Sequence, residues 1–379
     1  MLGTVASNPY AGMAWMHMQF VVGLRRLGHD AYYFETTSTW PYDPVRESKV
    51  CDSDYALPYL RKVANDFGLE HYWAYRRSYS DKEWFGLNRT KAEDLLANAD
   101  VVLNIAGATS LAEQGLKVGR HVYVGTDPVL YELSISEGRE LWLLDELDEF
   151  VTYGENIGND GCVIPPLPRL RGKTRQPVVM DYWKPATTTQ RRYTTVGNWE
   201  QQGFDIVHKG ERYYWSKHYE FLKFVDLPSR VTPVIELAIG RGSMSNEHRL
   251  LLESQGWLLR DALPLTSDPW TYRDYVCASR GEFTVAKDQN VRLRSGWFSE
   301  RSACYLAAGR PVITQDTGFG CVLPTGEGLF AFNTVEDIMK AFETIESDYE
   351  KHCRAARIIA EDYFKAERVL ARLLNDLGL

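Results

Sequence analysis

The stretch that decides the fold is residues 295–320, which read SGWFSERSACYLAAGRPVITQDTGFG. A Ser-Gly turn leads into Ser299, a good helix N-cap, and the helix that follows is expected to end at Gly309. After Pro311 a short apolar strand breaks into a polar turn. A helix that leads through a tight turn into a buried strand is typical of an α/β sheet with parallel strands.

The same stretch predicts a phosphate site. A loop that feeds a helix N-terminus presents unpaired N–H groups and the positive end of the helix dipole, which together suit an anion. Ser295, Gly296 and Ser299 lie at that helix start. The turn beyond the strand suits a sugar-like ligand held beside the phosphate, and its residues are Gln315, Asp316, Thr317 and Gly318.

With 44% hydrophobic and 25% charged residues, the composition is that of a soluble globular protein. A chain of 379 residues is long enough for two domains. No apolar run approaches the length of a membrane span and the start does not resemble a signal peptide, so we expect a cytoplasmic protein. Six scattered cysteines without a CxxC pair predict reduced thiols and no zinc site. A net charge of −8 argues against a generally basic, nucleic-acid-binding surface.

Strand and helix signals alternate along the chain. In the first part the expected strands are residues 2–6, 31–35, 101–105, 121–124 and 150–153. Residues 162–177 are rich in proline and arginine and are expected to form a connector without regular structure. The alternation then restarts, with strands expected at residues 193–196, 234–238, 257–260, 282–285 and 312–314, and mainly helix from Val335 onward. This pattern predicts an α/β protein with two Rossmann-like parallel-sheet domains, residues 1–176 and 177–364.

Residues 305–319, YLAAGRPVITQDTGF, resemble the GT-B nucleotide-sugar glycosyltransferases, whose C-terminal domains carry a small-residue helix, an AxG-x-PVV step and a donor-sugar loop. The resemblance implies an active site in the cleft between the domains, with the donor on the C-terminal domain and the acceptor on the N-terminal one. It also implies that the last helix, residues 365–379, packs back on the N-terminal domain. Many retaining members carry two glutamates eight residues apart before this glycine, and Gly296 and Cys304 stand at those positions here.

The implied reaction moves a glycosyl group from a nucleotide diphosphate to an acceptor hydroxyl. We expect UDP as the nucleotide and no other cofactor. We also expect no metal ion, because no DxD-like motif lies in a suitable turn. The sequence does not name the acceptor, and a small molecule or a glycan is the favoured class.

Three side chains are candidates for proton transfer near the carboxyl edge of the first sheet. His17 lies on the first helix and has an ordinary pKa near neutrality, while a histidine on an apolar helix is more often a packing residue. Asp127 and Glu155 each follow an expected strand, where a carboxylate could accept a proton from an attacking hydroxyl or simply cap a turn. Gly12, in the first strand-to-helix turn, would let a ligand approach the backbone.

Basic side chains are the candidates for the diphosphate. In the resembled enzymes such a residue follows the first strand of the second domain, and Lys217 is preferred here over Lys209 and Arg241. Arg301 lies beside the expected phosphate loop, with further basic residues just before it, and this density of positive charge suits a leaving diphosphate.

Other functions stay open. A nucleotide-sugar 2-epimerase and a non-catalytic nucleotide-sugar-binding protein are compatible with the same fold. A third alternative is glucosylation of hydroxymethylated bases in phage DNA, for which the basic residues 169–175 would contact the polyanion.

Overall fold

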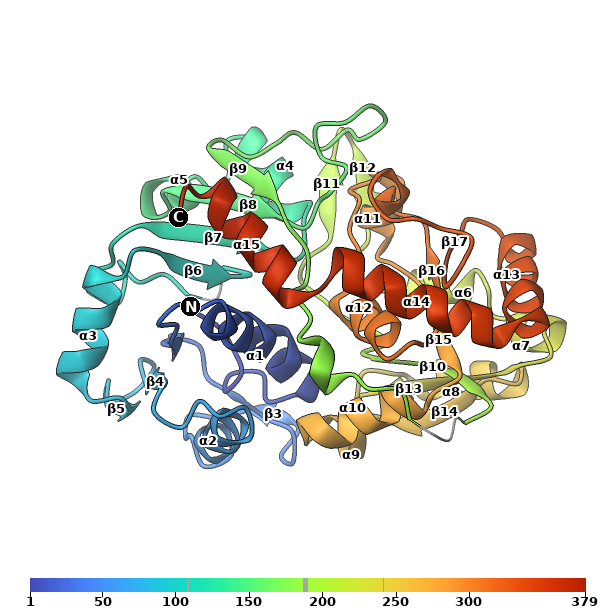
Figure 1. Cartoon of the computed structure of the whole chain (residues 1–379), viewed down its shortest axis with the longest axis horizontal. Helices are drawn as coiled ribbons and strands as arrows, with labels where there is room; N and C mark the ends of the chain where they lie inside the picture. Colours follow the sequence, from blue (N-terminus) through green and yellow to red (C-terminus); the bar gives the residue numbers. More distant parts are fainter. Residues whose placement is uncertain (108, 187–189, 241) are drawn as a thin grey trace.

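The computed structural model describes residues 1–107, 109–186, 190–240 and 242–379, and it contains two sheets of mainly parallel strands (Figure 1). The first sheet is formed by the N-terminal half, and Leu2 joins its two parts by parallel bridges to Phe34 and Asn104. Its strands run in the order β5 (Trp84–Gly86), β4 (Trp73–Arg76), β1 (Tyr33–Glu35), the Leu2 bridge, β6 (Val102–Ile105), β7 (His121–Gly125), β8 (Glu149–Thr152) and β9 (Leu170–Lys173). Among the named strands of this sheet, β5 is antiparallel to its neighbour.

The second sheet has six parallel strands. In spatial order they are β14 (Leu258–Asp261), β13 (Val234–Ile239), β10 (Arg192–Gly197), β15 (Gly281–Thr284), β16 (Val312–Gln315) and β17 (Leu329–Phe332). Numbered along the chain this order is 3-2-1-4-5-6, that of a doubly wound sheet, and it reverses between β10 and β15. Ligands of such sheets bind in the crevice beyond the carboxyl ends of the strands at that reversal.

Helices cover the sheets and connect the strands. Those of the N-terminal half are α1 (Ala11–Arg26), α2 (Ala56–Asp66), α3 (Arg89–Asn98), α4 (Leu130–Ser136) and α5 (Trp142–Glu146). The helices that follow β10, up to the one directly after β17, are α6 (His218–Leu222), α7 (Leu227–Arg230), α8 (Asn246–Ser254), α9 (Leu263–Thr266), α10 (Pro269–Ala278), α11 (Asp288–Arg292), α12 (Glu300–Ala307) and α13 (Val335–Ser347). The α12 helix begins as predicted, with the Ser299 side chain accepting a hydrogen bond from the Arg301 N–H.

The end of the chain returns to the N-terminal half. After α14 (Tyr349–Tyr363), a parallel bridge joins Lys365 to Val178, and α15 (Ala366–Asp376) packs against α1 and β9. The C-terminus therefore lies beside the first sheet (Figure 1). The domain boundaries at residues 176 and 364 stay predictions.

The α/β prediction with two Rossmann-like sheets is confirmed, but several elements differ from expectation. Residues 2–6 pair with the sheet only at Leu2, after which the chain turns toward α1. The expected connector contains β9, because its prolines lie outside Leu170–Lys173 and leave that segment free to pair with β8. The strand β17 and a hairpin of β11 (Ile206–His208) and β12 (Glu211–Tyr213) were not predicted.

No helix in the described part of the chain is long and apolar enough to cross a membrane. The described residues also contain no group of three or more His, Cys, Asp or Glu side chains placed to hold a metal ion. The cytoplasmic location stays a prediction.

Candidate functional site

A small cavity lies where the start of α1 meets the start of α12 and the reversal point of the second sheet. Its lining comes from both halves of the chain: Gly12, Trp15, Met16, Gln19, Gln176, Tyr272, Glu300, Arg301 and Cys304. At Gly12 an added Cβ would meet nothing within 4 Å, so the space directly beside the first turn of α1 is open there. The cavity therefore joins the two places where the sequence predicts ligand contacts.

Arg301 is held firmly at the end of β10. Its Nε donates to Glu282 at 2.6 Å, Nη1 donates to the Val196 carbonyl at 2.6 Å, and Nη2 donates to Thr284 at 3.0 Å. These bonds use three of the five N–H donors of a guanidinium, so donors remain for a ligand. The side chain is thus oriented in advance at the crevice where the strand order reverses.

Lys217 is the second predicted cation of the site. It precedes α6, and its ammonium lies 5.2 Å from the ring centroid of Trp297. Among the described residues it has no hydrogen-bond or ion-pair partner. Burial lowers the pKa of Lys217 to about 7, and the positive charge of Arg301 acts in the same direction. An anion bound here would relieve this cost.

Lys287 and Asp127 form an ion pair between the two halves of the chain. The Lys287 ammonium also lies 2.9 Å from the ring centroid of Trp215. Burial raises the pKa of Asp127, although the charge of Lys287 opposes this. Asp127 Oδ1 is buried and has no hydrogen-bond partner among the described residues. The predicted base Asp127 interacts electrostatically with the cavity residue Glu300 but does not itself line the cavity, and a lysine already pairs with one of its oxygens.

The other two predicted catalytic side chains lie elsewhere. His17 is fully buried against Gly3 and Tyr33, and burial lowers its pKa to about 4. The α1 residues that line the cavity share one helix face, and His17 lies on the opposite face. Glu155 forms a buried ion pair with Arg175 at 2.5 Å. Burial raises the pKa of Glu155, against the effect of Arg175. The structure does not bring these two side chains to the cavity lining.

The Ser295–Gly296 turn is built around Asn156 of the N-terminal half. The Asn156 N–H donates to the Ser295 carbonyl at 3.1 Å, and its side-chain amide donates to the Arg294 carbonyl at 2.9 Å. Gly296 has a φ of +80°, and any side chain there would collide with Asn156. Trp297 also crosses to the N-terminal half, since its indole N–H donates to the Thr126 carbonyl at 2.9 Å. This turn is therefore part of the contact between the halves.

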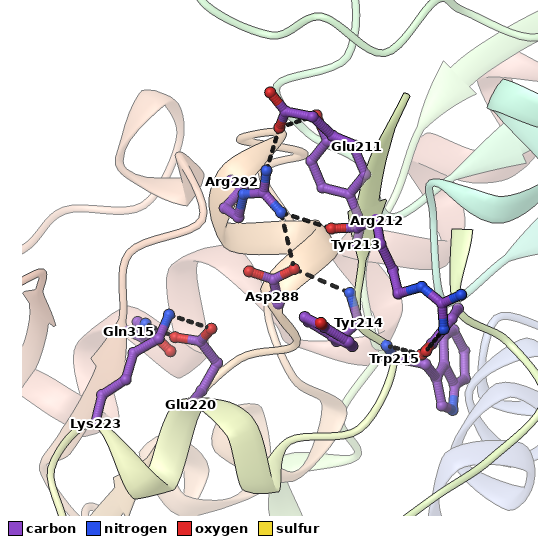
Figure 2. Close-up of polar contacts among 11 residues, drawn as sticks. Glu211, Arg212, Tyr213, Tyr214, Trp215, Glu220, Lys223, Asp288, Arg292 and Gln315 are labelled. Carbon is purple, nitrogen blue, oxygen red and sulfur yellow. Dashed lines mark hydrogen bonds and ion pairs between the residues drawn. The ribbon is translucent and has the colours of Figure 1, made fainter. Parts of the chain in front are cut away.

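The polar turn after β16 has partners within the protein. The Gln315 amide donates to Glu220 at 2.6 Å, as Figure 2 shows, and Asp316 Oδ1 accepts the Gly318 N–H at 2.8 Å. The Thr317 hydroxyl donates to the Trp297 carbonyl at 2.5 Å. Their assignment to the donor sugar stays a prediction. Arg241, the remaining predicted donor contact, lies outside the described residues.

The hairpin β11–β12 leads into Lys217 and lies against both halves. Its Ile206 and Tyr213 pack with apolar residues of the N-terminal half that include Val129 and Leu133. Arg292 of α11 pairs with Glu211 and donates to the Arg212 carbonyl (Figure 2). Asp288 of α11 accepts the Tyr214 N–H at 2.9 Å. The contacts with α11 thus hold the segment that leads to Lys217 in place.

Glu300 is a cavity residue that was not among those predicted from the sequence. It is the first residue of α12, it is partly exposed, and it lines the cavity. In the part of the chain that the structure describes, its carboxylate has no hydrogen-bond or ion-pair partner. Its place directly between the N-cap Ser299 and the cation Arg301 was the available signal.

No model of a known protein family matches the sequence, and no curated protein sequence matches it. Among solved structures, the chain is similar to Alr3699/HepE of Anabaena in complex with UDP and glucose, with a TM-score of 0.55, 10% identity, and coverage of 97% of this chain and 95% of that one. It is also similar to AviGT4, a glycosyltransferase involved in avilamycin A biosynthesis, with a TM-score of 0.51, 12% identity, and coverage of 96% and 87%. The match to TarM has a TM-score of 0.47 and 9% identity and covers 79% of this chain and 60% of that chain. The sheet order and the likenesses to HepE and AviGT4 together show that the chain has the GT-B fold of the nucleotide-sugar glycosyltransferases.

Proposed function

We propose that this protein transfers a sugar from a nucleotide-diphosphate sugar, with UDP as the nucleotide, to an acceptor hydroxyl. The observation that carries the proposal is the ammonium of Lys217, which interacts with the charge of Arg301 near the reversal point of a doubly wound sheet and has no ion-pair partner among the described residues. A doubly charged diphosphate is the kind of ligand that this pair of cations would bind.

The chemistry follows from where the charges lie. When the glycosidic bond breaks, negative charge develops on the departing diphosphate. Lys217 and Arg301 would stabilise that charge, because a fixed cation in a site sheltered from water acts more strongly than one in bulk solvent. The two side chains supply the positive charge, so the proposed reaction needs no metal ion.

The choice of UDP has support from the fold neighbours. HepE, which shares the fold along nearly the whole chain, has been solved with UDP, with UDP and glucose, and with UDP-glucose. The identity of 10% to HepE gives no information about the sugar or the acceptor of this chain. The acceptor class favoured here remains a small molecule or a glycan.

Calorimetric titration with UDP tests the proposal in the presence of EDTA. We expect the wild type to bind UDP and K217Q to bind it about 10- to 150-fold more weakly, the equivalent of one charge-assisted hydrogen bond. The matched control is K209Q, because Lys209 lies in the exposed turn between β11 and β12 and was the sequence's other lysine candidate. Equal losses in both variants, or a wild type that binds no UDP, would overturn the proposal.

The alternatives differ in their products. An epimerase would convert a UDP-sugar into its isomer without releasing UDP, whereas a transferase releases UDP as it moves the sugar to an acceptor or to water.

The basic residues 169–175 give little support to DNA as the acceptor. Arg171 and Arg175 pair with Glu149 and Glu155, and Arg169 and Lys173 donate to backbone carbonyls.

A further inference from the structure

We propose that Glu300 is the general base of the reaction and accepts the proton of the acceptor hydroxyl. This inference rests on the proposed function and adds a catalytic residue to it. It comes from the placement of Glu300 in the cavity and from the state of the other carboxylates around it.

Glu300 lies at the meeting point of the two halves. It lines the cavity together with Gly12 of α1, where an added Cβ would meet no atom within 4 Å. Its negative charge raises the pKa of Lys217, of Arg301 and of Asp127, so it acts on all three side chains. A hydroxyl that enters between α1 and α12 would meet this carboxylate next to the proposed diphosphate position.

The neighbouring carboxylates are already engaged. The pairs are Asp127 with Lys287, Glu155 with Arg175, Glu282 with Arg301, and Glu220 with Gln315 and Lys223. A cation beside a carboxylate favours its ionised form and makes it a weaker proton acceptor than an unpaired carboxylate. Glu300 has no such partner among the described residues, so it is free to act.

The proposed step balances as follows. The acceptor oxygen forms a bond to the anomeric carbon while its proton moves to a carboxylate oxygen of Glu300. The bond between the anomeric carbon and the diphosphate oxygen breaks, and UDP leaves with that electron pair. Lys217 and Arg301 receive the charge of the leaving group. The proton later passes from Glu300 to solvent.

The test compares an acceptor that needs a base with one that does not. Water must lose a proton to attack the sugar, whereas azide is already an anion. We measure UDP release from UDP-glucose, UDP-galactose and UDP-N-acetylglucosamine, alone and with azide, and use the sugar that the wild type hydrolyses fastest. For E300Q we expect hydrolysis to fall about 10²- to 10⁴-fold, with azide transfer close to wild type and UDP affinity within about threefold. E300D should recover part of the hydrolysis.

The control is E336Q, because Glu336 is an exposed acidic residue in the first turn of α13. This variant measures how much activity is lost when a carboxylate at the start of a helix is removed away from the cavity. If E300Q hydrolyses like E336Q, or if its water and azide reactions fall in parallel, Glu300 is not the base. A wild type that binds UDP and gives those results overturns this inference alone. A wild type that binds no UDP overturns the proposed function and this inference with it.

Discussion

Two groups of polar residues lie near the carboxyl edge of the second sheet, and they differ in whether the protein already satisfies them. At the end of β16 and in the turn after it, Gln315, Asp316 and Thr317 each have a hydrogen-bond partner within the chain. Lys217 and Glu300 have none among the described residues. A satisfied group must break a bond to bind a ligand, whereas an unsatisfied one gains a bond. The comparison teaches that position at a sheet edge is a weaker sign of function than unused bonding capacity.

The largest effect that would sharpen this comparison is the pH dependence of donor binding. Lys217 must be protonated to attract a diphosphate, and its pKa is about 7 in the free protein. The affinity for UDP-glucose should therefore weaken as the pH rises from 6 to 9, by about tenfold per unit above the pKa until it reaches the level of K217Q. Calorimetry or fluorescence titration across this range measures it.

The control for this prediction is K217R. A guanidinium stays protonated across the whole range, so binding by K217R should be nearly independent of pH. The K217Q profile should be flat as well, but at low affinity. A K217Q variant that keeps the slope of the wild type would show that another group titrates.

The second effect concerns the turn after β16 and is one of stability. T317V keeps the shape of the buried side chain but leaves the Trp297 carbonyl without its hydrogen bond. Unfolding in urea should show a loss of about 1–3 kcal/mol, while UDP affinity of the folded protein stays within about threefold. The matched change T344V, at a hydroxyl on the exposed side of α13, should cost less than about 0.5 kcal/mol. A T317V protein of normal stability that binds UDP poorly would break the comparison.

A smaller loss is expected at Asp316, whose Oδ1 caps the turn by accepting the Gly318 N–H. D316A should lower stability by about 0.5–1.5 kcal/mol, and its transfer rate should fall only as the folded fraction falls. D316N, which keeps an acceptor oxygen, should recover most of the loss. Steady-state kinetics beside a thermal melt decides the matter, because a sugar-binding Asp316 would lose turnover at an unchanged Tm.

The smallest expected effect is a gain in stability, whereas the two preceding variants lose stability. The pKa of Lys217 is about 7 in the fold against an ordinary value of 10.5, so its charge disfavours the folded state at and below neutral pH. K217Q without ligand should therefore raise the Tm by about 1–3 °C at pH 6. Between pH 7 and 10.5 the unfolded chain holds a proton that the folded chain has lost, so the wild type gains stability and the advantage of K217Q shrinks. A K217Q protein that melts below wild type at pH 6 would show that Lys217 has a structural partner.

Five of the six strands of the second sheet could be predicted from the sequence, because apolar strands and capped helices leave local signals. Ser299 and Gly309 are such signals at the two ends of α12. The hairpin β11–β12 has a weaker sequence signal in Gly210 and was not predicted. In the structure Lys209 and Gly210 both take the positive φ of a tight hairpin turn. The isolated pairing of Leu2 could not be predicted, because it depends on two distant neighbours in the sheet.

The candidate site was predictable in its location and less so in its residues. Lys217 and Arg301 were found from the resemblance and from charge density, and both lie where the strand order reverses. The ion pair of Asp127 could not be predicted from the sequence, because its partner Lys287 is distant along the chain and comes from the other half. The same holds for Glu300, which stands out only after the neighbouring carboxylates are seen to be paired.

The return of α15 to α1 has a consequence for biosynthesis. The helix that covers this side of α1, with Leu370 and Leu373 buried, follows both sheets along the chain. While the ribosome makes the second sheet, the half that emerged earlier still lacks this cover and exposes apolar surface. The N-terminal half is therefore completed only after the second sheet has been made, and until α15 emerges its uncovered surface is of the kind that chaperones bind.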